Sequence, residues 1–276
     1  MQTLLNRHPL RIYFLLAYLI SWLIWLPLVL EGQGWVNREF PPYLYALGFT
    51  GGTVAALIVT AVSQHSSGVK QLLGGLIRYR VNWRWYAFAI FVPLLMFIVA
   101  VTLNYAMTGV WPDWREYGRM DDMFPGVGLL GTAVLHFLLV WLGEEVGWRG
   151  FALPRLQNKY SPLRATFILA IFWGFWHLPI FLVADSFLIG LGTALFFVVV
   201  TFPIAVVYTW LYNGTGGSLL ITSLWSTSLA LGIGSAAAVG AVSGLMMGFI
   251  IIIAVILIYK SGAKLGWQNM YGFLGK

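Results

Sequence analysis

The chain has 276 residues, of which 60% are hydrophobic and only 9% are charged, and it contains no cysteine. A soluble domain carries about 25% charged residues, so this composition excludes that class and indicates a membrane protein. The lack of cysteine excludes disulfides, thiolate metal sites and cysteine nucleophiles. Sixteen Lys and Arg stand against nine Asp and Glu. In so apolar a chain this excess indicates membrane topology, and nucleic acid is not an expected partner.

Uncharged stretches long enough to cross a bilayer follow one another along the chain, because about 20 apolar residues suffice for one span. Segment 186–259 contains no Asp, Glu, Lys or Arg and has room for three spans, divided by turn residues 213–217 and small residues 232–238. We therefore predict an all-α, polytopic membrane protein of about eight transmembrane helices, with 1–276 as a single membrane domain. The first five spans are expected at 12–30, 43–62, within 85–112, 123–143 and 165–184.

The charges predict the orientation of these spans. With alternating spans, Arg38, Arg115 and Arg119 fall on outer loops, and the remaining thirteen of the sixteen positive residues fall inside. Short loops rich in Lys and Arg stay in the cytoplasm, so both termini are predicted to be cytoplasmic. The acids show the opposite distribution, and Glu144 and Glu145 alone lie on the inner side. An ionisable group at membrane depth is a functional-site hypothesis.

The two glutamates belong to the segment Gly-Glu-Glu-Val-Gly-Trp-Arg-Gly at 143–150. On an α-helix Glu145 and Arg149 are four residues apart, with the acid on the favourable N-terminal side, which predicts an ion pair. Glu144 is turned from Glu145 by about 100°. The spacing therefore predicts a structural Glu145–Arg149 pair and a free Glu144 carboxylate. The alternative interpretation is a plain charge cluster at a helix end.

A histidine lies inside the fifth predicted span, in the run Phe-Trp-Gly-Phe-Trp-His-Leu-Pro that ends at Pro179. Because Pro179 cannot donate a backbone hydrogen bond, we expect a kink beside His177. A carboxylate and an imidazole on consecutive helices suffice to activate a water, with or without a metal. The alternative is a packed core histidine. Glu144 is expected near the inner surface and His177 deeper, so the two meet only if their helices are offset.

At these residues the sequence resembles the CPBP (CAAX protease and bacteriocin-processing, or Abi) family of intramembrane metalloproteases, which includes the CAAX prenyl endopeptidases. Its Glu-Glu-x-x-x-Arg motif is matched by Glu144, Glu145 and Arg149, and its Phe-x-x-x-His motif by His177, with Trp173 in place of Phe. The resemblance covers roughly 130–230. It implies an eight-helix membrane fold whose site opens toward the cytoplasm and hydrolyses a peptide bond in prenylated proteins or peptide precursors.

The resemblance also implies roles for these residues. Glu144 would activate the water, Arg149 would brace the site, and His177 would bind metal or help to hold the water and the oxyanion. The family's third motif, a histidine followed four residues later by Asn or Asp, is absent, because no histidine follows His177. The gapless position of that histidine is Ser226, whose hydroxyl is a substitute hydrogen-bond donor.

The missing histidine weakens the prediction of a metal. A catalytic zinc usually has three protein ligands, and Glu144 and His177 supply two. His136 lies about 12 Å along the α-helix from Glu144 and about 80° around it, so the two cannot share a metal unless the helix breaks. Zinc is therefore expected only if a third ligand is found.

Three classes of function fit the sequence. The first, favoured by the motifs, is a membrane endopeptidase that acts on a prenylated or hydrophobic peptide in a prokaryotic cell membrane. The second is a catalytically silent relative that binds such a ligand as an immunity or scaffold protein. The third is a transporter or channel with a Glu–His proton relay. For a peptidase we expect Glu144, His177 and Ser226 to converge within about 6 Å around one cavity.

Small residues repeat every four positions near the C-terminus, at Ala236, Gly240, Gly244 and Gly248. Such a face is typical of close helix packing in membranes. We expect it to pack inside this bundle, with homodimerisation as the alternative.

Overall fold

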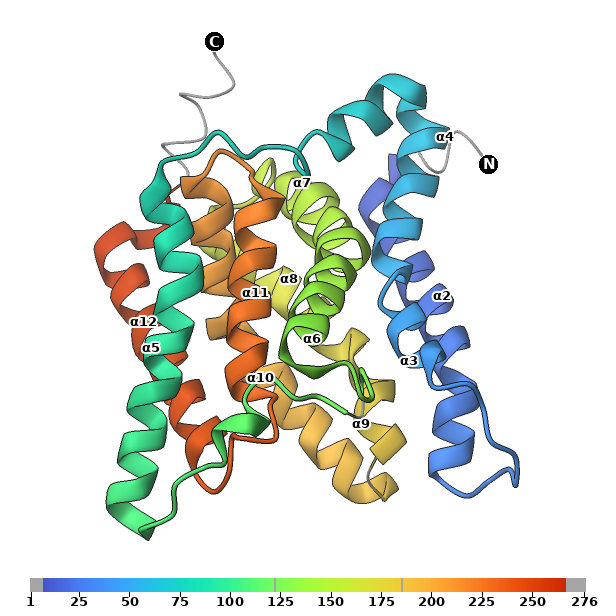
Figure 1. Cartoon of the computed structure of the whole chain (residues 1–276). Coiled ribbons are helices and arrows are strands. Elements are labelled where there is room, and N and C mark those ends of the chain that lie inside the picture. Colours follow the sequence, from blue (N-terminus) through green and yellow to red (C-terminus); the bar gives the residue numbers. More distant parts are fainter. Residues whose placement is uncertain (1–6, 122, 185, 267–276) are drawn as a thin grey trace.

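A computed structural model of the chain describes residues 7–121, 123–184 and 186–266 (Figure 1). The regular structure of these residues is helical, and none of them forms a strand. Seven helical segments among them are long and apolar enough to cross a membrane. The chain is therefore an all-α, polytopic membrane protein, as predicted. Asp122 and Asp185, expected on the outer side, and Lys276, expected inside, lie outside the described residues.

The N-terminal third supplies three membrane-crossing segments. The second is longer than predicted, because helix continues through the polar residues around His65, where the backbone is kinked with φ at 56°. The third begins where the Asn82 side chain accepts a hydrogen bond from the backbone N–H of Arg84, and it ends at Gly109, whose φ is 70°. The helices are α2 (Pro9–Gly32), α3 (Tyr43–Gly48), α4 (Gly51–Leu73) and α5 (Trp83–Thr108).

The remaining helices confirm both predicted divisions of segment 186–259. The chain turns after Gly214 and again after Ile233. The helix between these turns is apolar but has only 15 residues, so it is shorter than each of the seven membrane-crossing segments. A short 3-10 turn, η1 (Trp114–Glu116), precedes this half. The helices are α6 (Gly128–Leu139), the π-helix η2 (Val140–Ala152), α7 (Leu153–Gln157), α8 (Pro162–Trp176), α9 (Leu178–Ala184), α10 (Phe187–Gly214), α11 (Leu219–Ile233) and α12 (Val242–Ser261).

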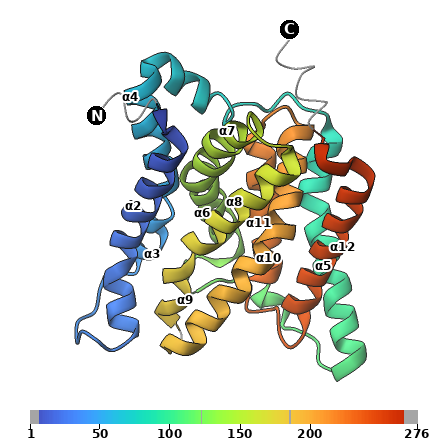
Figure 2. The same ribbon diagram turned by 180° about the vertical axis from the view of Figure 1, so that it is seen from behind.

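The π-helix occupies the middle of the bundle. It packs against α4 on one side and α11 on another, while α8 packs along α10 and α5 packs along α11. In Figures 1 and 2 the green rod of α6, the π-helix and α7 lies between blue α2–α4 and orange α11. The first turn of α2 and the last turn of α12 lie at the same end of the bundle (Figure 1). That this end faces the cytoplasm stays a prediction.

The expected small-residue face is only partly packed inside the bundle, at Gly240, where an added methyl group would lie 2.6 Å from Asn104 Oδ1. Ala236 and Gly240 lie in the turn before α12, so they share no helix face with Gly244 and Gly248. A methyl group added at either Gly244 or Gly248 would meet no described atom within 4 Å. The prediction of tight internal packing is therefore wrong at these positions, because the small residues span a turn and a helix instead of one continuous helix. Homodimerisation stays a prediction.

Candidate active site

The two glutamates lie in the middle of a membrane-crossing segment. The fourth span was predicted at 123–143 with the acids at its inner end, but the segment runs from Gly128 to Gln157. Counting uncharged residues placed the end of this span too early. The helix continues through the acids, which are paired or hydrogen-bonded inside the bundle. This shift places Glu144 well inside a membrane-crossing segment, where it and His177 both contact Trp173.

The residues around the acids form a π-helix, where an α-helix was expected. A π-helix has i→i+5 hydrogen bonds and occurs frequently at functional sites. The angles and distances predicted for an α-helix, including those between His136 and Glu144, therefore do not describe this segment. Its 13 residues, Val140–Ala152, include both acids and Arg149.

Two glycines let the π-helix approach α4. A methyl group at Gly147 would lie 2.5 Å from the backbone carbonyl of Gly52, and one at Gly143 would lie 3.2 Å from the carbonyl oxygen of Phe49. Small residues at four-residue spacing allow such backbone contact in membranes. The glycines of the motif therefore fix where the acids lie relative to α4.

The predicted ion pair is present and fully buried. Arg149 Nη1 donates to Glu145 Oε1 at 2.9 Å, and both side chains are 1% exposed. The guanidinium also lies 3.9 Å from the Trp173 ring centroid and 4.1 Å from that of Tyr208; these rings meet at 62°, so it lies in the corner between their faces. Thr222 of α11 lies near Glu145, but its hydroxyl donates to the carbonyl oxygen of Leu219, and Glu145 Oε2 has no hydrogen-bond partner among the described residues. Arg149 thus packs against α8 and α10, while Glu145 faces α11.

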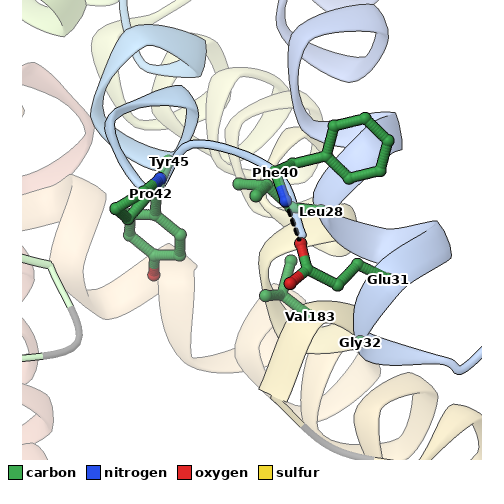
Figure 3. Close-up of a pocket in the computed structure, with 7 residues that line it drawn as sticks. All are labelled: Leu28, Glu31, Gly32, Phe40, Pro42, Tyr45 and Val183. Atoms are coloured by element: carbon green, nitrogen blue, oxygen red, sulfur yellow. Dashed lines mark hydrogen bonds between the residues drawn. The ribbon is translucent and has the colours of Figure 1, made fainter. Parts of the chain in front are cut away.

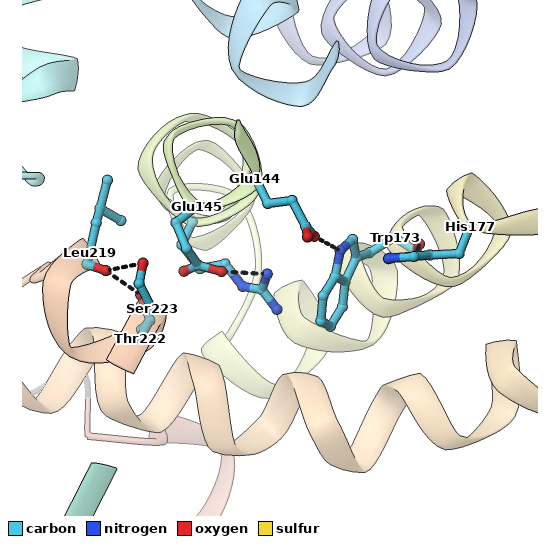
Figure 4. Close-up of polar contacts among 8 residues, drawn as sticks. Glu144, Glu145, Trp173, His177, Leu219, Thr222 and Ser223 are labelled. Atoms are coloured by element: carbon cyan, nitrogen blue, oxygen red, sulfur yellow. Dashed lines mark hydrogen bonds and ion pairs between the residues drawn. The ribbon is translucent and has the colours of Figure 1, made fainter. Parts of the chain in front are cut away.

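Glu144 points away from this pair, toward α8. Its Oε2 accepts a hydrogen bond of 3.0 Å from the indole N–H of Trp173, and the side chain is 6% exposed. Its Oε1 accepts no hydrogen bond from the residues that the structure describes. Figure 4 shows the carboxylate beside Trp173, with Glu145 turned toward α11. The two neighbouring acids therefore face different partners. The sequence predicted a free Glu144 carboxylate, but one of its oxygens is bound by Trp173.

His177 lies at the break between α8 and α9, close to the kink predicted from Pro179. Its Nδ1 is 2.7 Å from the carbonyl oxygen of Trp173. A carbonyl accepts only, so Nδ1 carries the proton and the neutral ring presents an Nε2 lone pair. Four aromatic rings surround the imidazole with centroids 4.8 to 6.1 Å away, those of Phe49, Trp173, Trp176 and Phe197.

Glu144 and His177 therefore converge on one residue, Trp173. Glu144 contacts its indole nitrogen, while His177 contacts its carbonyl oxygen and packs edge-on against its ring. Figure 4 shows the two side chains approaching from the π-helix and from the end of α8.

Ser226 lies on the other side of the cluster. It is half-buried on α11 and lies near Tyr208, whose ring centroid lies 4.1 Å from the Arg149 guanidinium. Its neighbour Thr227 faces the buried His136, with 3.3 Å between Oγ1 and Nδ1. His136 is thus engaged with α11. The described residues contain no group of three His, Cys, Asp or Glu placed to hold a metal ion.

Sequence reasoning missed two members of the cluster. Trp173 was noted only as a departure from a motif, without a partner for its N–H. Tyr208 is one of 13 tyrosines, and no pattern distinguished it. One signal was available for Trp173: a buried carboxylate needs a hydrogen-bond donor.

A cavity of about 270 Å³ lies elsewhere, where the end of α2 meets α3 and α9 (Figure 3). Glu31 borders it and accepts a hydrogen bond of 3.0 Å from the backbone N–H of Phe40. None of the predicted site residues lines it. Its lining consists of Leu28, Glu31, Gly32, Phe40, Pro42, Tyr45 and Val183.

The fold and the cluster define a polytopic membrane protein with a carboxylate and an imidazole held inside its helix bundle. Residues 126–229, which include Glu144 to Ser226, match the family model of the Type II CAAX prenyl endopeptidase Rce1-like proteins. CAAX prenyl protease 2 of Methanococcus maripaludis is 22% identical over 228 residues, covering 78% of this chain and 80% of that protein. Both matches support the predicted family, because the chain is similar in each case to CAAX prenyl proteases.

Proposed function

We propose that the chain is a membrane endopeptidase of the CAAX prenyl protease type, in which Glu144 activates the hydrolytic water. The observation that carries this proposal is the state of Glu144. One carboxylate oxygen is fixed by Trp173, the other has no partner among the described residues, and the nearby Arg149 is paired with Glu145. A general base needs this combination of fixed orientation and a free oxygen.

The proposed reaction needs only water and the peptide. Glu144 Oε1 accepts a proton from a water whose oxygen attacks the carbonyl carbon of the scissile bond, which forms a tetrahedral intermediate. The intermediate collapses with breakage of the C–N bond, and Glu144 returns the proton to the leaving amine. Such acid–base catalysis contributes about 10²–10⁴-fold to the rate.

His177 and Arg149 support this reaction in different ways. The Nε2 lone pair of His177 accepts a hydrogen bond and so orients the water. Arg149 Nη2 is a buried donor without a partner among the described residues, and a charged donor of this kind stabilises an oxyanion. Ser226, at the edge of the cluster, is the further donor that we propose for this role.

A bound zinc stays a proposal, but the side chains at this site fit a zinc ion poorly. Glu144 and His177 would be its ligands, and bound zinc would polarise the carbonyl and acidify the water. A catalytic zinc usually has three protein ligands, and the described part of the chain offers no such group. No step of the proposed mechanism is therefore assigned to a metal.

We propose a prenylated or otherwise hydrophobic peptide as the substrate. The relative from Methanococcus maripaludis is named as a CAAX prenyl protease, and a prenyl chain attached to a C-terminal Cys-a-a-X motif partitions into the bilayer. The aromatic rings around His177 make the surroundings of the proposed site apolar, and the Phe197 ring among them is partly exposed. We place the protein in a prokaryotic cell membrane with the site open to the cytoplasm, from the charges of its loops.

The test uses the full chain in nanodiscs and a prenylated Cys-a-a-X peptide with a quenched fluorophore. Glu144→Ala is expected to lower turnover about 10²–10⁴-fold while peptide binding, measured by fluorescence anisotropy, persists. Glu39→Ala removes an exposed acid far from the site and serves as the matched control. Undiminished turnover in Glu144→Ala would refute the role of this residue.

A catalytically silent binding protein is the second candidate. It is favoured by the placement of Ser226, which stands where the resemblance expects a histidine and contacts Tyr208. This candidate predicts that the wild-type chain binds the same peptides without cleaving any of them, with or without added zinc. That result would overturn the endopeptidase proposal.

A further inference from the structure

We infer that Trp173 is the positioning residue of the site, and that its indole N–H holds the Glu144 carboxylate in its working orientation. This inference rests on the proposed function. It concerns a residue at which the chain departs from the motif that it resembles, where phenylalanine is expected. Phenylalanine would keep an aromatic ring and the backbone carbonyl but would offer no N–H.

Trp173 contacts each of the three charged or titratable groups on its side of the cluster. Its N–H donates to Glu144, its ring face covers the Arg149 guanidinium at 3.9 Å, and its carbonyl oxygen lies 2.7 Å from His177 Nδ1. The side chain is 7% exposed, so water does not compete freely for these contacts. Rotation of this one indole would release Glu144 and uncover Arg149.

The other hydrogen-bonded tryptophans of the described chain behave differently. The indole N–H groups of Trp22, Trp25 and Trp176 donate to backbone carbonyl oxygens. Such bonds satisfy a donor within the fold. Trp173 donates to an acid instead, and a hydrogen bond to a carboxylate is stronger than one between neutral groups. The contrast indicates that its N–H serves Glu144 and not only the packing of α8.

The bond restricts Glu144 in the way that general-base catalysis requires. With Oε2 tied to α8, the carboxylate cannot rotate toward Arg149, and Oε1 keeps one direction. Without the N–H, Glu144 can turn to the charged guanidinium beside it and lose its basic oxygen to an ion pair. Loss of positioning should therefore lower the rate of the chemical step more than the binding of the peptide.

The test compares Trp173→Phe with Trp25→Phe in the peptide assay. Trp25 is fully buried, and its N–H donates to Tyr45 at 2.8 Å, so its replacement matches the loss of ring size and of one hydrogen bond. We expect kcat to fall about 10- to 100-fold in Trp173→Phe with KM within about twofold. Trp25→Phe should keep the wild-type kcat and lose similar thermal stability. Equal kcat losses in both variants, or none in Trp173→Phe, would overturn the inference.

A second measurement does not depend on turnover. In the ¹⁵N-indole NMR spectrum, the Trp173 resonance is the one missing from Trp173→Phe, and the Trp25 resonance is identified in the same way. Glu144→Gln should move the Trp173 resonance and leave that of Trp25 in place. A stationary Trp173 resonance overturns the inference. An inactive wild type whose Trp173 resonance does move overturns the proposed function while the hydrogen bond stands.

Discussion

Two arginine–carboxylate clusters in this chain have similar geometry and opposite surroundings. Arg149 pairs with Glu145 at 2.9 Å with both side chains 1% exposed. Arg119, in the loop before α6, pairs with Glu116 at 2.7 Å and with Asp121 at 2.5 Å, but half of its side chain is exposed. The exposed contacts are the shorter ones. Distance therefore does not tell which cluster the fold depends on.

The surroundings determine which cluster the fold depends on, because they set the free-energy cost of leaving a charge without a partner. In water an unpaired arginine is solvated, so an exposed pair contributes little. Inside the bundle the partner that remains is buried without compensation, and removing one member of such a pair is strongly destabilising. The Trp173 and Tyr208 rings around Arg149 exclude water and so increase this dependence.

The largest expected effect comes from breaking the buried pair. Glu145→Met should lower the free energy of unfolding by about 3–5 kcal/mol, because it leaves Arg149 charged and unpaired. The double variant Glu145→Met, Arg149→Leu removes both charges and should recover most of this loss. Reversible unfolding in mixed detergent micelles measures both. A double variant less stable than the single one would show that the pair itself stabilises the fold.

An intermediate effect is expected where the π-helix touches α4. Gly147→Ala places a methyl group 2.5 Å from the Gly52 backbone, so the helices must separate, at a cost of about 1–3 kcal/mol. Gly244→Ala is the matched control, because a methyl group there meets open space and alanine favours helix. The same unfolding measurement applies. Equal stability of the two variants would show that the contact with α4 is not needed to hold the buried pair.

Much of the fold could be predicted from the sequence, because membrane-crossing helices appear in it as long stretches without charged residues. The turn at 213–217 and the break near Ile233 follow from such stretches and from turn residues. The end of the fourth span does not follow. The count stopped at Glu144, but the helix continues, and inside the bundle Trp173 binds one oxygen of Glu144 while Arg149 pairs with one of Glu145.

The candidate site divides in the same way between local and long-range contacts. The Glu145–Arg149 pair follows from a spacing of four residues on one helix. The bond between Glu144 and Trp173 joins the π-helix to α8. The contact between the Arg149 guanidinium and the Tyr208 ring joins it to α10. These contacts depend on how three helices pack, which no spacing within one helix encodes. The π-helix itself was missed because sequence periodicity was taken to be that of an α-helix.

The smallest effect is expected at the exposed cluster, and it completes the comparison. The carboxylates of Asp121 and Glu116 raise the pKa of the Arg119 guanidinium above its ordinary value, which shows that the charges attract one another. Water and salt screen this attraction, and each side chain released by a substitution regains its freedom. Arg119→Ala should therefore leave the unfolding transition unchanged within error at physiological salt. A loss comparable to that of Glu145→Met would mean that contact distance, and not burial, sets the importance of an ion pair in this chain.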